Sequence, residues 1–277
     1  TVCEICDRYY IKMQSKKTCA TCFTFMGIAG SIILFTQIAA LDYSPAIPQP
    51  TPYPALQVPA HIVPVPNTVS PELQKLIAAP YDPSWKVAPT NNAQWKSLVA
   101  ADAAAVIATL PQLRETLGVK VEAMNIAGVN VFMVTPNIIP PENQNRLLVH
   151  VHGGGYVFGP GEAGTLEAIE MAGYGHFKVI SVNYRMPPDF PFPAGLDDAI
   201  AVWKVAITMA KPENIGIVGS SAGGGLVLAM VLRAKQEHLP MPGAIAAGTP
   251  WADLSKTGDT YFSNQMLDNI LVSYDGA

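Results

Sequence analysis

The sequence has 277 residues, of which 49% are apolar and only 14% are charged. That length suggests one large domain or two small ones, and the composition excludes a disordered chain or a coiled coil because it can supply a large apolar core. Seventeen basic residues against 21 acidic ones give a net charge of −4 without a basic block, so nucleic acid is excluded as a partner.

The first segment, residues 1–40, has the order of a secretory leader. Lys16 and Lys17 precede an uncharged, largely apolar stretch at 18–41, with small residues around Ala40. A basic region, an apolar region and small residues at the cleavage point are typical of a signal peptide. We therefore expect cleavage after Ala40 and export to the periplasm or the medium. The alternatives are an uncleaved membrane anchor, because about 20 apolar residues can span a bilayer, and a segment with neither role.

All four cysteines of the sequence lie in this leader. Their spacing, C-x2-C-x12-C-x2-C, resembles a zinc ribbon in outline. The second pair falls inside the apolar stretch of the predicted signal peptide, so we expect no metal site, and nothing else in the sequence indicates a cofactor. The four residues are Cys3, Cys6, Cys19 and Cys22.

A proline-rich linker, residues 41–69, follows the leader. Nine prolines lie between Tyr43 and Pro71, counting Pro71 itself. Proline lacks a backbone N–H donor and favours an extended chain. We therefore expect a semi-rigid tether with no packed domain of its own.

Two helices are predicted at about 70–117, before the first strand. Ser70 followed by Pro71 is a typical helix start, because serine caps the free N–H groups and proline needs none. A second, alanine-rich helix is expected over 92–110. Pro111 is expected to break it.

The rest of the predicted domain, residues 70–277, alternates between strands and helices. Residues 119–126 and 129–135 flank a glycine-containing turn and predict an antiparallel pair. Four short apolar runs then alternate with helical stretches, which is the pattern of a parallel sheet buried on both faces. The runs are 147–152, 179–183, 215–219 and 244–248, and the helical stretches are at about 163–174, 194–209 and 222–237.

Residues 219–223 carry a G-x-S-x-G motif between a predicted strand and a predicted helix. Gly219 and Gly223 permit a tight turn that projects the hydroxyl of Ser221. The helix N-terminus beneath it favours developing negative charge. Ser221 is therefore the candidate nucleophile, and a surface glycine turn is the alternative.

A run of three glycines follows the predicted strand at 147–152. In the loop His152-Gly153-Gly154-Gly155 the backbone N–H groups can turn into a pocket, and an acyl-transfer oxyanion needs such donors about 3 Å from its charge. The loop lacks the spacing of a phosphate-binding motif. We therefore expect an oxyanion hole, with a flexible glycine loop as the alternative.

Together, four motifs resemble the bacterial hormone-sensitive-lipase family of esterases. They are His152-Gly153-Gly154-Gly155, Tyr184-Arg185-Met186-Pro187-Pro188 with Phe192-Pro193-Ala194 and Asp197-Asp198, Gly219-Ser220-Ser221-Ala222-Gly223-Gly224, and Pro250-Trp251-Ala252-Asp253-Leu254. The resemblance implies an α/β-hydrolase fold, a helical N-terminal cap over the acyl pocket and a small-molecule ester as substrate. It assigns the nucleophile to Ser221 and the oxyanion hole to the N–H groups of Gly153, Gly154 and Ala222, supported by His152, Gly155, Gly219 and Gly223.

The sequence departs from the family pattern in two places. Ser220 stands where Asp or Thr is usual, which we expect to alter local hydrogen bonding more than mechanism. The family carries its triad acid and base histidine after its seventh and eighth strands, whereas this sequence ends at Ala277, just past the sixth. We therefore expect a C-terminally truncated member whose last strands and triad Asp and His lie beyond the chain.

Two functions remain open at this point. The first is a serine carboxylesterase that cleaves short- to medium-chain acyl esters or lactones through an acyl-enzyme on Ser221. The second is a non-catalytic fragment, or a binding member of the α/β-hydrolase fold. An Asp and a His following the present C-terminus would favour the first.

Overall fold

The computed structural model describes residues 62–80 and 89–255. The predicted leader with its cysteines, and most of the predicted linker, lie outside these ranges. Within them, no helix is long and apolar enough to cross a membrane.

A six-stranded sheet forms the centre of the described domain, in the order β1-β2-β4-β3-β5-β6. β1 pairs with β2, and β2 with β4, in antiparallel fashion, whereas the other neighbours are parallel. The predicted mostly parallel sheet with antiparallel first strands is confirmed. The strands are β1 Val119–Ile126, β2 Val129–Pro136, β3 Leu147–Val151, β4 Lys178–Val182, β5 Ile215–Ser220 and β6 Ala244–Gly248.

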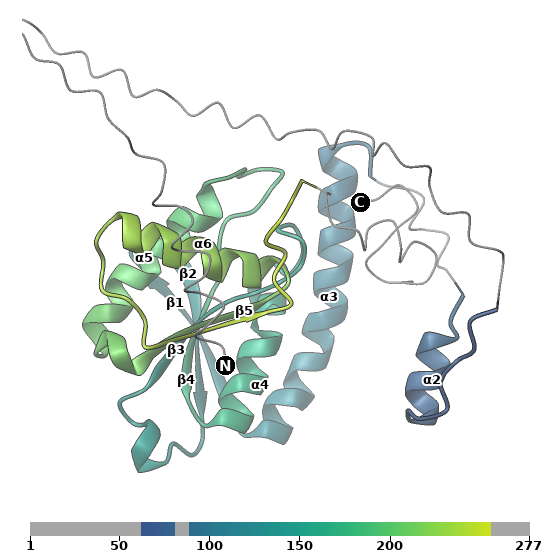
Figure 1. Ribbon diagram of the computed structural model, residues 1–277, viewed down its shortest axis with the longest axis horizontal. Helices are drawn as coiled ribbons and strands as arrows, with labels where there is room; N and C mark the ends of the chain where they lie inside the picture. Colours follow the sequence, from purple (N-terminus) through teal and green to yellow (C-terminus); the bar gives the residue numbers. More distant parts are fainter. Residues whose placement is uncertain (1–61, 81–88, 256–277) are drawn as a thin grey trace, which may run out of the picture. The chain divides into compact units, whose positions relative to one another are not determined.

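Helices cover both faces of this sheet (Figure 1). On one face, α5 and α6 bury the fully enclosed side chains of Trp203 and Met230 against the strands. On the other face, α3 and α4 contribute Leu110 and Ile169 to a second apolar cluster. The parallel strands β3, β4 and β5 are apolar runs buried almost throughout, as the sequence indicated, whereas the residues of β6 are mostly exposed. The helices are α2 Pro71–Ile77, α3 Asn92–Leu117, α4 Leu166–Gly175, α5 Ala194–Met209 and α6 Ala222–Gln236.

The predicted break at Pro111 is wrong, because α3 continues through it to Leu117. A proline inside a helix loses one backbone hydrogen bond and costs about 3 kcal/mol. Leu110 is fully buried and Leu113 packs against the same cluster, and burying such a side chain contributes roughly 1.5–3 kcal/mol. Packing on both sides of the proline therefore outweighs the lost bond. The helix is followed by its C-cap Gly118, whose φ of 61° lies in the left-handed region that glycine adopts without strain.

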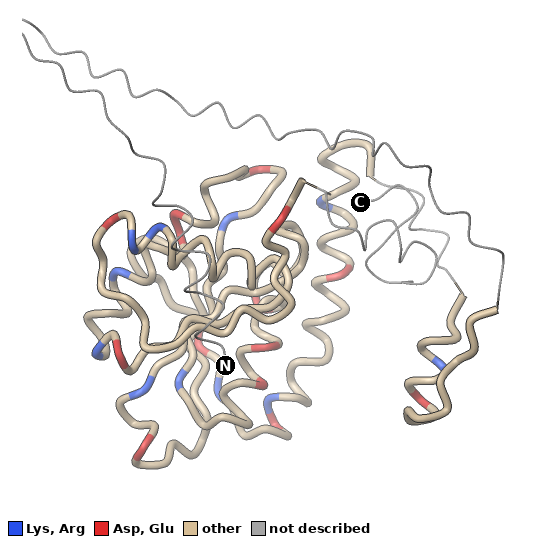
Figure 2. The backbone as a smooth tube through the Cα atoms, viewed as in Figure 1, with Lys and Arg blue, Asp and Glu red and all other residues tan. Residues whose placement is uncertain are grey.

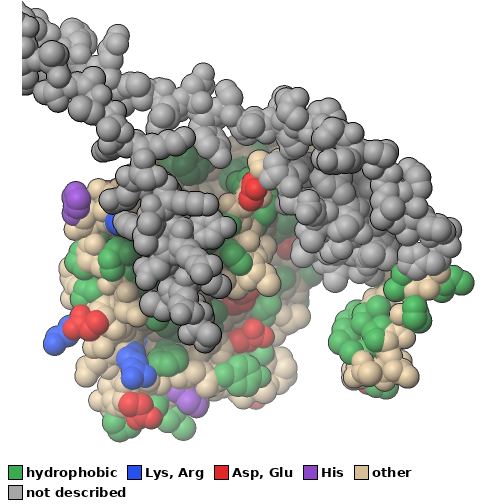
Figure 3. All heavy atoms as spheres, in the orientation of Figure 1, with side chains coloured by type: hydrophobic (Ala, Val, Ile, Leu, Met, Phe, Trp, Pro, Cys, Tyr) green, Lys and Arg blue, Asp and Glu red, His purple; other side chains and the backbone are tan. Residues whose placement is uncertain are grey.

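The short helix α2 begins as the sequence predicts. The Leu73 N–H donates to the Ser70 hydroxyl at 3.3 Å, which caps the helix. No residue of α2 is buried, and Leu73, Leu76 and Ile77 are exposed. Figure 3 shows apolar side chains, in green, over this short segment at the right of the view.

Charged side chains are scattered over the described elements, with both signs interspersed (Figure 2). Several form ion pairs between segments that are distant in the sequence. Arg114 of α3 contacts Glu162, which lies just before α4, at 3.0 Å. Lys204 of α5 contacts Glu237, at the end of α6, at 2.7 Å. These pairs join neighbouring helices on each face of the sheet.

Candidate active site

The candidate nucleophile lies at a sharp turn between a strand and a helix. β5 ends at Ser220 and α6 begins at Ala222, and Ser221 between them has φ 54° and ψ −121°. Such a conformation is strained for a residue with a side chain and persists only where the surroundings hold it. Here the Ser221 N–H donates to the Gly248 carbonyl, and the Trp251 N–H donates to the Ser221 carbonyl, both at 2.9 Å.

The glycines of the G-x-S-x-G motif are required by close packing of this turn against the end of β3. A Cβ on Gly219 would lie 2.3 Å from the Val151 carbonyl oxygen, and one on Gly223 would lie 2.1 Å from the same atom. Any side chain at either position would force two backbone segments apart. The predicted strand–turn–helix context of Ser221 is therefore present.

The three-glycine loop lies directly against the nucleophile turn. A Cβ on Gly153 would meet the Ser220 carbonyl oxygen at 2.9 Å and the Ser221 Cβ at 3.4 Å. Gly154 has φ 106°, and its carbonyl accepts from the N–H of Phe158 at 2.8 Å, which closes a tight turn. Gly155 also has a positive φ, of 59°. The structure thus brings together the two loops that the sequence singled out.

Buried His152 orients the peptide group between the first two glycines. Its Nδ1 donates to the Gly153 carbonyl at 2.8 Å. In a trans peptide the C=O and N–H groups point in opposite directions, so this bond directs the Gly154 N–H away from the histidine. Burial lowers the pKa of His152 to about 4, and the ring is therefore neutral near pH 7.

Tyr184 holds His152 from the other side. Its ring stacks on the imidazole with centroids 4.4 Å apart, and its hydroxyl donates to the His152 carbonyl at 2.8 Å. Tyr184 belongs to the second motif, which follows β4. The next residue, Arg185, binds Asp198 of α5 through its backbone N–H and its guanidinium at 2.8–3.0 Å. This motif therefore ties the loop after β4 to both the glycine loop and α5.

Backbone N–H groups of both loops lack a hydrogen-bond acceptor among the described residues. Those of Gly153, Gly154 and Ala222 donate to no residue within 62–80 and 89–255. Ala222 is the first residue of α6, so its N–H also lies at the positive end of a helix dipole. Free N–H groups on two loops in contact, beside a serine hydroxyl, form an arrangement able to stabilise an oxyanion.

The four histidines within the described ranges are poorly suited to be the general base for Ser221. Both ring nitrogens of His150 are already hydrogen-bonded, and the low pKa of His152 makes it a weak base. His176 follows α4, before the amino end of β4, so it lies at the opposite edge of the parallel strands from Ser221. His238 lies 17 residues beyond Ser221 in the sequence, and at 1.5 Å per residue along α6 that is about 25 Å. The fifth histidine of the sequence lies outside the described residues.

Glu167, which belongs to none of the sequence motifs, lies beside the nucleophile turn. Glu167 is in the first turn of α4 and accepts hydrogen bonds from the Ser220 hydroxyl and from His150 Nε2. Ser220 was noted as a departure from the family pattern, and this contact is its altered hydrogen bonding. A half-buried polar residue next to the nucleophile indicates a hydrogen-bond partner, but sequence spacing alone cannot identify that partner.

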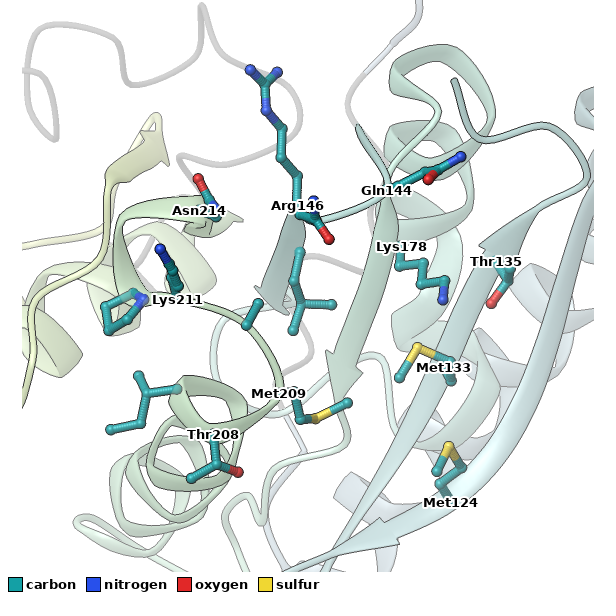
Figure 4. A pocket seen from close by; sticks show the side chains of 15 residues that line it. Met124, Met133, Thr135, Gln144, Arg146, Lys178, Thr208, Met209, Lys211 and Asn214 are labelled. Atoms are coloured by element: carbon teal, nitrogen blue, oxygen red, sulfur yellow. The ribbon is translucent and has the colours of Figure 1, made fainter. Parts of the chain in front are cut away.

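Two cavities lie on different sides of the described domain. One, of about 560 Å³, is mainly apolar and is lined by Tyr156 and Trp251, whose rings stack 5.9 Å apart beside the glycine loop. The other, of about 970 Å³, lies where β3, β4 and β5 begin, and Arg146 and Lys178 line it (Figure 4). Ser221 is at the opposite, carboxyl end of β5, so the larger cavity is not the acyl-transfer site.

No metal site is evident in the parts of the chain that the structure describes. Within 62–80 and 89–255, no group of three or more His, Cys, Asp or Glu side chains is placed to hold a metal ion. The four cysteines lie outside these ranges.

This fold, with a strained serine turn against a glycine loop, is that of an α/β hydrolase, and residues 148–276 match the family described as alpha/beta hydrolase fold. The crystal structure of an esterase, E25, superposes with a TM-score of 0.73 at 35% identity, covering 80% of this chain and 69% of that one. A hormone-sensitive lipase from a metagenome library superposes with a TM-score of 0.57 at 25% identity, covering 68% of this chain and 60% of that one. The chain belongs to the hormone-sensitive-lipase-like family of α/β hydrolases.

Curated relatives match over part of their length. An acetyl-hydrolase from Streptomyces hygroscopicus is 28% identical over 137 residues, which are 49% of this chain and 46% of that protein. An esterase from Acinetobacter venetianus is 29% identical over 154 residues, 55% of this chain and 50% of that protein. The chain thus spans about half the length of the curated relatives it matches.

Proposed function

We propose that the full-length protein is a serine hydrolase that cleaves carboxylic esters through an acyl-enzyme on Ser221. The observation that carries this proposal is the strained Ser221 turn packed against Gly153, with N–H groups on both loops that have no acceptor among the described residues. The similar proteins named esterase and acetyl-hydrolase support carboxylic esters as the substrate class.

The proposed reaction has two halves. The Ser221 oxygen attacks the ester carbonyl carbon while a base removes its proton, and the carbonyl oxygen becomes an oxyanion that accepts hydrogen bonds from Gly153, Gly154 and Ala222. The C–O bond to the alcohol then breaks, and the alcohol leaves with the proton from the base. Water repeats the sequence on the acyl-enzyme and releases the acid. The base and its acidic partner are proposed to come from outside the described residues.

The substrates that we propose are short- to medium-chain acyl esters or lactones. The same oxyanion hole serves any tetrahedral intermediate of acyl transfer, so open-chain and cyclic esters share the chemistry. The apolar cavity of about 560 Å³ beside the glycine loop offers room for an acyl or alkyl group.

The test uses the full-length protein and the p-nitrophenyl esters of acetate, butyrate, octanoate and laurate, with a lactone in parallel. Ser221→Ala should reduce turnover to less than a few per cent, because no acyl-enzyme can form. Ser97→Ala is the matched control, since Ser97 is an exposed serine of α3, and it should keep full activity. A folded full-length protein that cleaves none of these esters would contradict the proposal and favour a binding member of the fold.

A further inference from the structure

The carboxylate of Glu167 connects the two strands that lead into the candidate site. One carboxylate oxygen accepts a hydrogen bond from the Ser220 hydroxyl, at the end of β5. The other lies 3.1 Å from Nε2 of His150 on β3, two residues before the glycine loop begins at His152. One side chain of α4 therefore holds the last residue before the nucleophile and the strand before the oxyanion loop.

A chain of hydrogen bonds continues from His150 into the next strand. His150 is fully buried, and its Nδ1 lies 3.0 Å from the hydroxyl of Ser181 on β4. That hydroxyl is 3.3 Å from the carbonyl of Gly164, just before α4 begins. The network thus spans β4, β3 and β5 and returns to the helix that carries Glu167. A connected network of this kind restricts the relative movement of the elements that it joins.

The hydrogen bonds to Glu167 show which atoms carry the protons at the centre of this network. A carboxylate accepts hydrogen bonds only, so the Ser220 hydroxyl and His150 Nε2 both donate to Glu167. The hydrogen bond from His150 lowers the pKa of Glu167, which outweighs the opposite effect of burial. The carboxylate is consequently ionised near neutral pH.

The contact between the two loops shows which distance this hydrogen-bond network would control. Gly153 packs on the Ser220 carbonyl oxygen, where a Cβ would be only 2.9 Å away. Any shift of Ser220 relative to β3 therefore changes the distance between the Ser221 hydroxyl and the N–H groups of the glycine loop. Misplacement of reacting groups by about 1 Å can cost roughly 100-fold in rate.

We propose that Glu167 is a positioning residue that sets the distance between the Ser221 hydroxyl and the oxyanion-binding N–H groups by hydrogen bonding to Ser220 and His150. This inference rests on the proposed serine hydrolase function. Glu167 acts through Ser220 and touches neither substrate nor reacting atoms. The hydrogen bonds, rather than the net charge of the carboxylate, carry the effect.

The experiment measures kcat and KM of the full-length protein for p-nitrophenyl butyrate, well below each variant's Tm. Glu167→Leu and Ser220→Ala should each lower kcat roughly 10-fold, with KM changed less than about two-fold. Glu167→Gln should retain kcat, because its carbonyl still accepts from His150 and its amide donates to the Ser220 oxygen. Glu170→Leu is the matched control, since Glu170 is an exposed residue of the same helix, and it should leave both constants unchanged.

A double mutant separates positioning from independent effects. If Glu167 acts through Ser220, Glu167→Leu combined with Ser220→Ala should be about as slow as the slower single variant, whereas independent losses would multiply. Multiplying losses, a kcat unchanged in both folded single variants, or a change in KM alone would overturn the inference. Ser220→Ala changes few atoms, so it also tests the inference if Glu167→Leu does not fold.

A second readout separates this inference from the proposed function. Phenylmethylsulfonyl fluoride sulfonylates a reactive serine oxygen with loss of HF, and mass spectrometry can follow the modification of Ser221. If the wild type cleaves no ester but is sulfonylated at Ser221, the ester function fails, and the same order of rates among the Glu167 and Ser220 variants still supports positioning. If Ser221 is not sulfonylated in the wild type either, both proposals fail.

Discussion

The substitution Gly153→Ala tests the contact between the glycine loop and the nucleophile turn. The added Cβ would lie 2.9 Å from the Ser220 carbonyl oxygen, whereas ordinary van der Waals contact begins at 3.4 Å. Ser220 is paired with Gly248 of β6, so the loop has to move away, by about 0.5 Å on these distances. If 1 Å of misplacement costs roughly 100-fold in rate, this shift should lower kcat about 10-fold, or about 1.4 kcal/mol in activation free energy.

The assay is steady-state hydrolysis of p-nitrophenyl butyrate by the full-length protein, with thermal unfolding measured in parallel. Gly216→Ala is the matched control: its Cβ would also meet an atom at 2.9 Å, but that atom is the Leu148 Cδ2, the movable end of a side chain. Gly216 lies at the other end of β5, so kcat should not change. A folded Gly153→Ala protein with kcat within about two-fold of wild type would refute the reasoning, as would an equal loss in the control.

Three further expectations follow from the structure and the sequence. Burial lowers the pKa of His152 from 6.5 to about 4. As the pH falls, the unfolded state therefore binds a proton before the folded state does, and the free energy of unfolding should drop by about 3 kcal/mol between pH 6.5 and pH 4. Chemical denaturation of His152→Phe over the same pH range should show a smaller drop. Leu110→Ala should cost about 2–5 kcal/mol of stability, measured by the same method, and a loss below 1 kcal/mol would contradict the packing account of α3. Mass spectrometry of the protein from its native host should find an N-terminus near Leu41, and an intact leader on a soluble protein would contradict export.

The sheet and the two loops were predictable because their signals are local. Apolar runs of five or six residues between helical stretches predict a parallel sheet, and strand bounds at β1 and β6 agree with the sequence-based ranges. The G-x-S-x-G and three-glycine motifs each lie within five residues. Both motifs follow parallel strands, and the carboxyl ends of parallel strands meet at one edge of the sheet, which accounts for the contact between the two loops.

What the sequence could not supply were contacts between distant residues. Glu167 and Ser220 are 53 positions apart, and no local pattern distinguishes Glu167 from other acidic residues on exposed helix faces. The same limit explains the error at Pro111. Its local penalty was correctly identified, but the buried side chains beside it lie against residues more than fifty positions away. A residue's local preference against a helix is overridden where the free energy of tertiary packing is larger.

The role of His152 shows how a local motif and a distant contact combine. The motif places a histidine beside the glycines, and the family resemblance gives it a supporting part in that loop. Burial under Tyr184 and the hydrogen bond to the Gly153 carbonyl show what this part is, because a neutral ring with a pKa of about 4 is a permanent donor at Nδ1. That donor orients one peptide, and the N–H on the far side of this peptide, that of Gly154, is one of those that we propose to bind the oxyanion. The imidazole therefore contributes to the site by holding its proton.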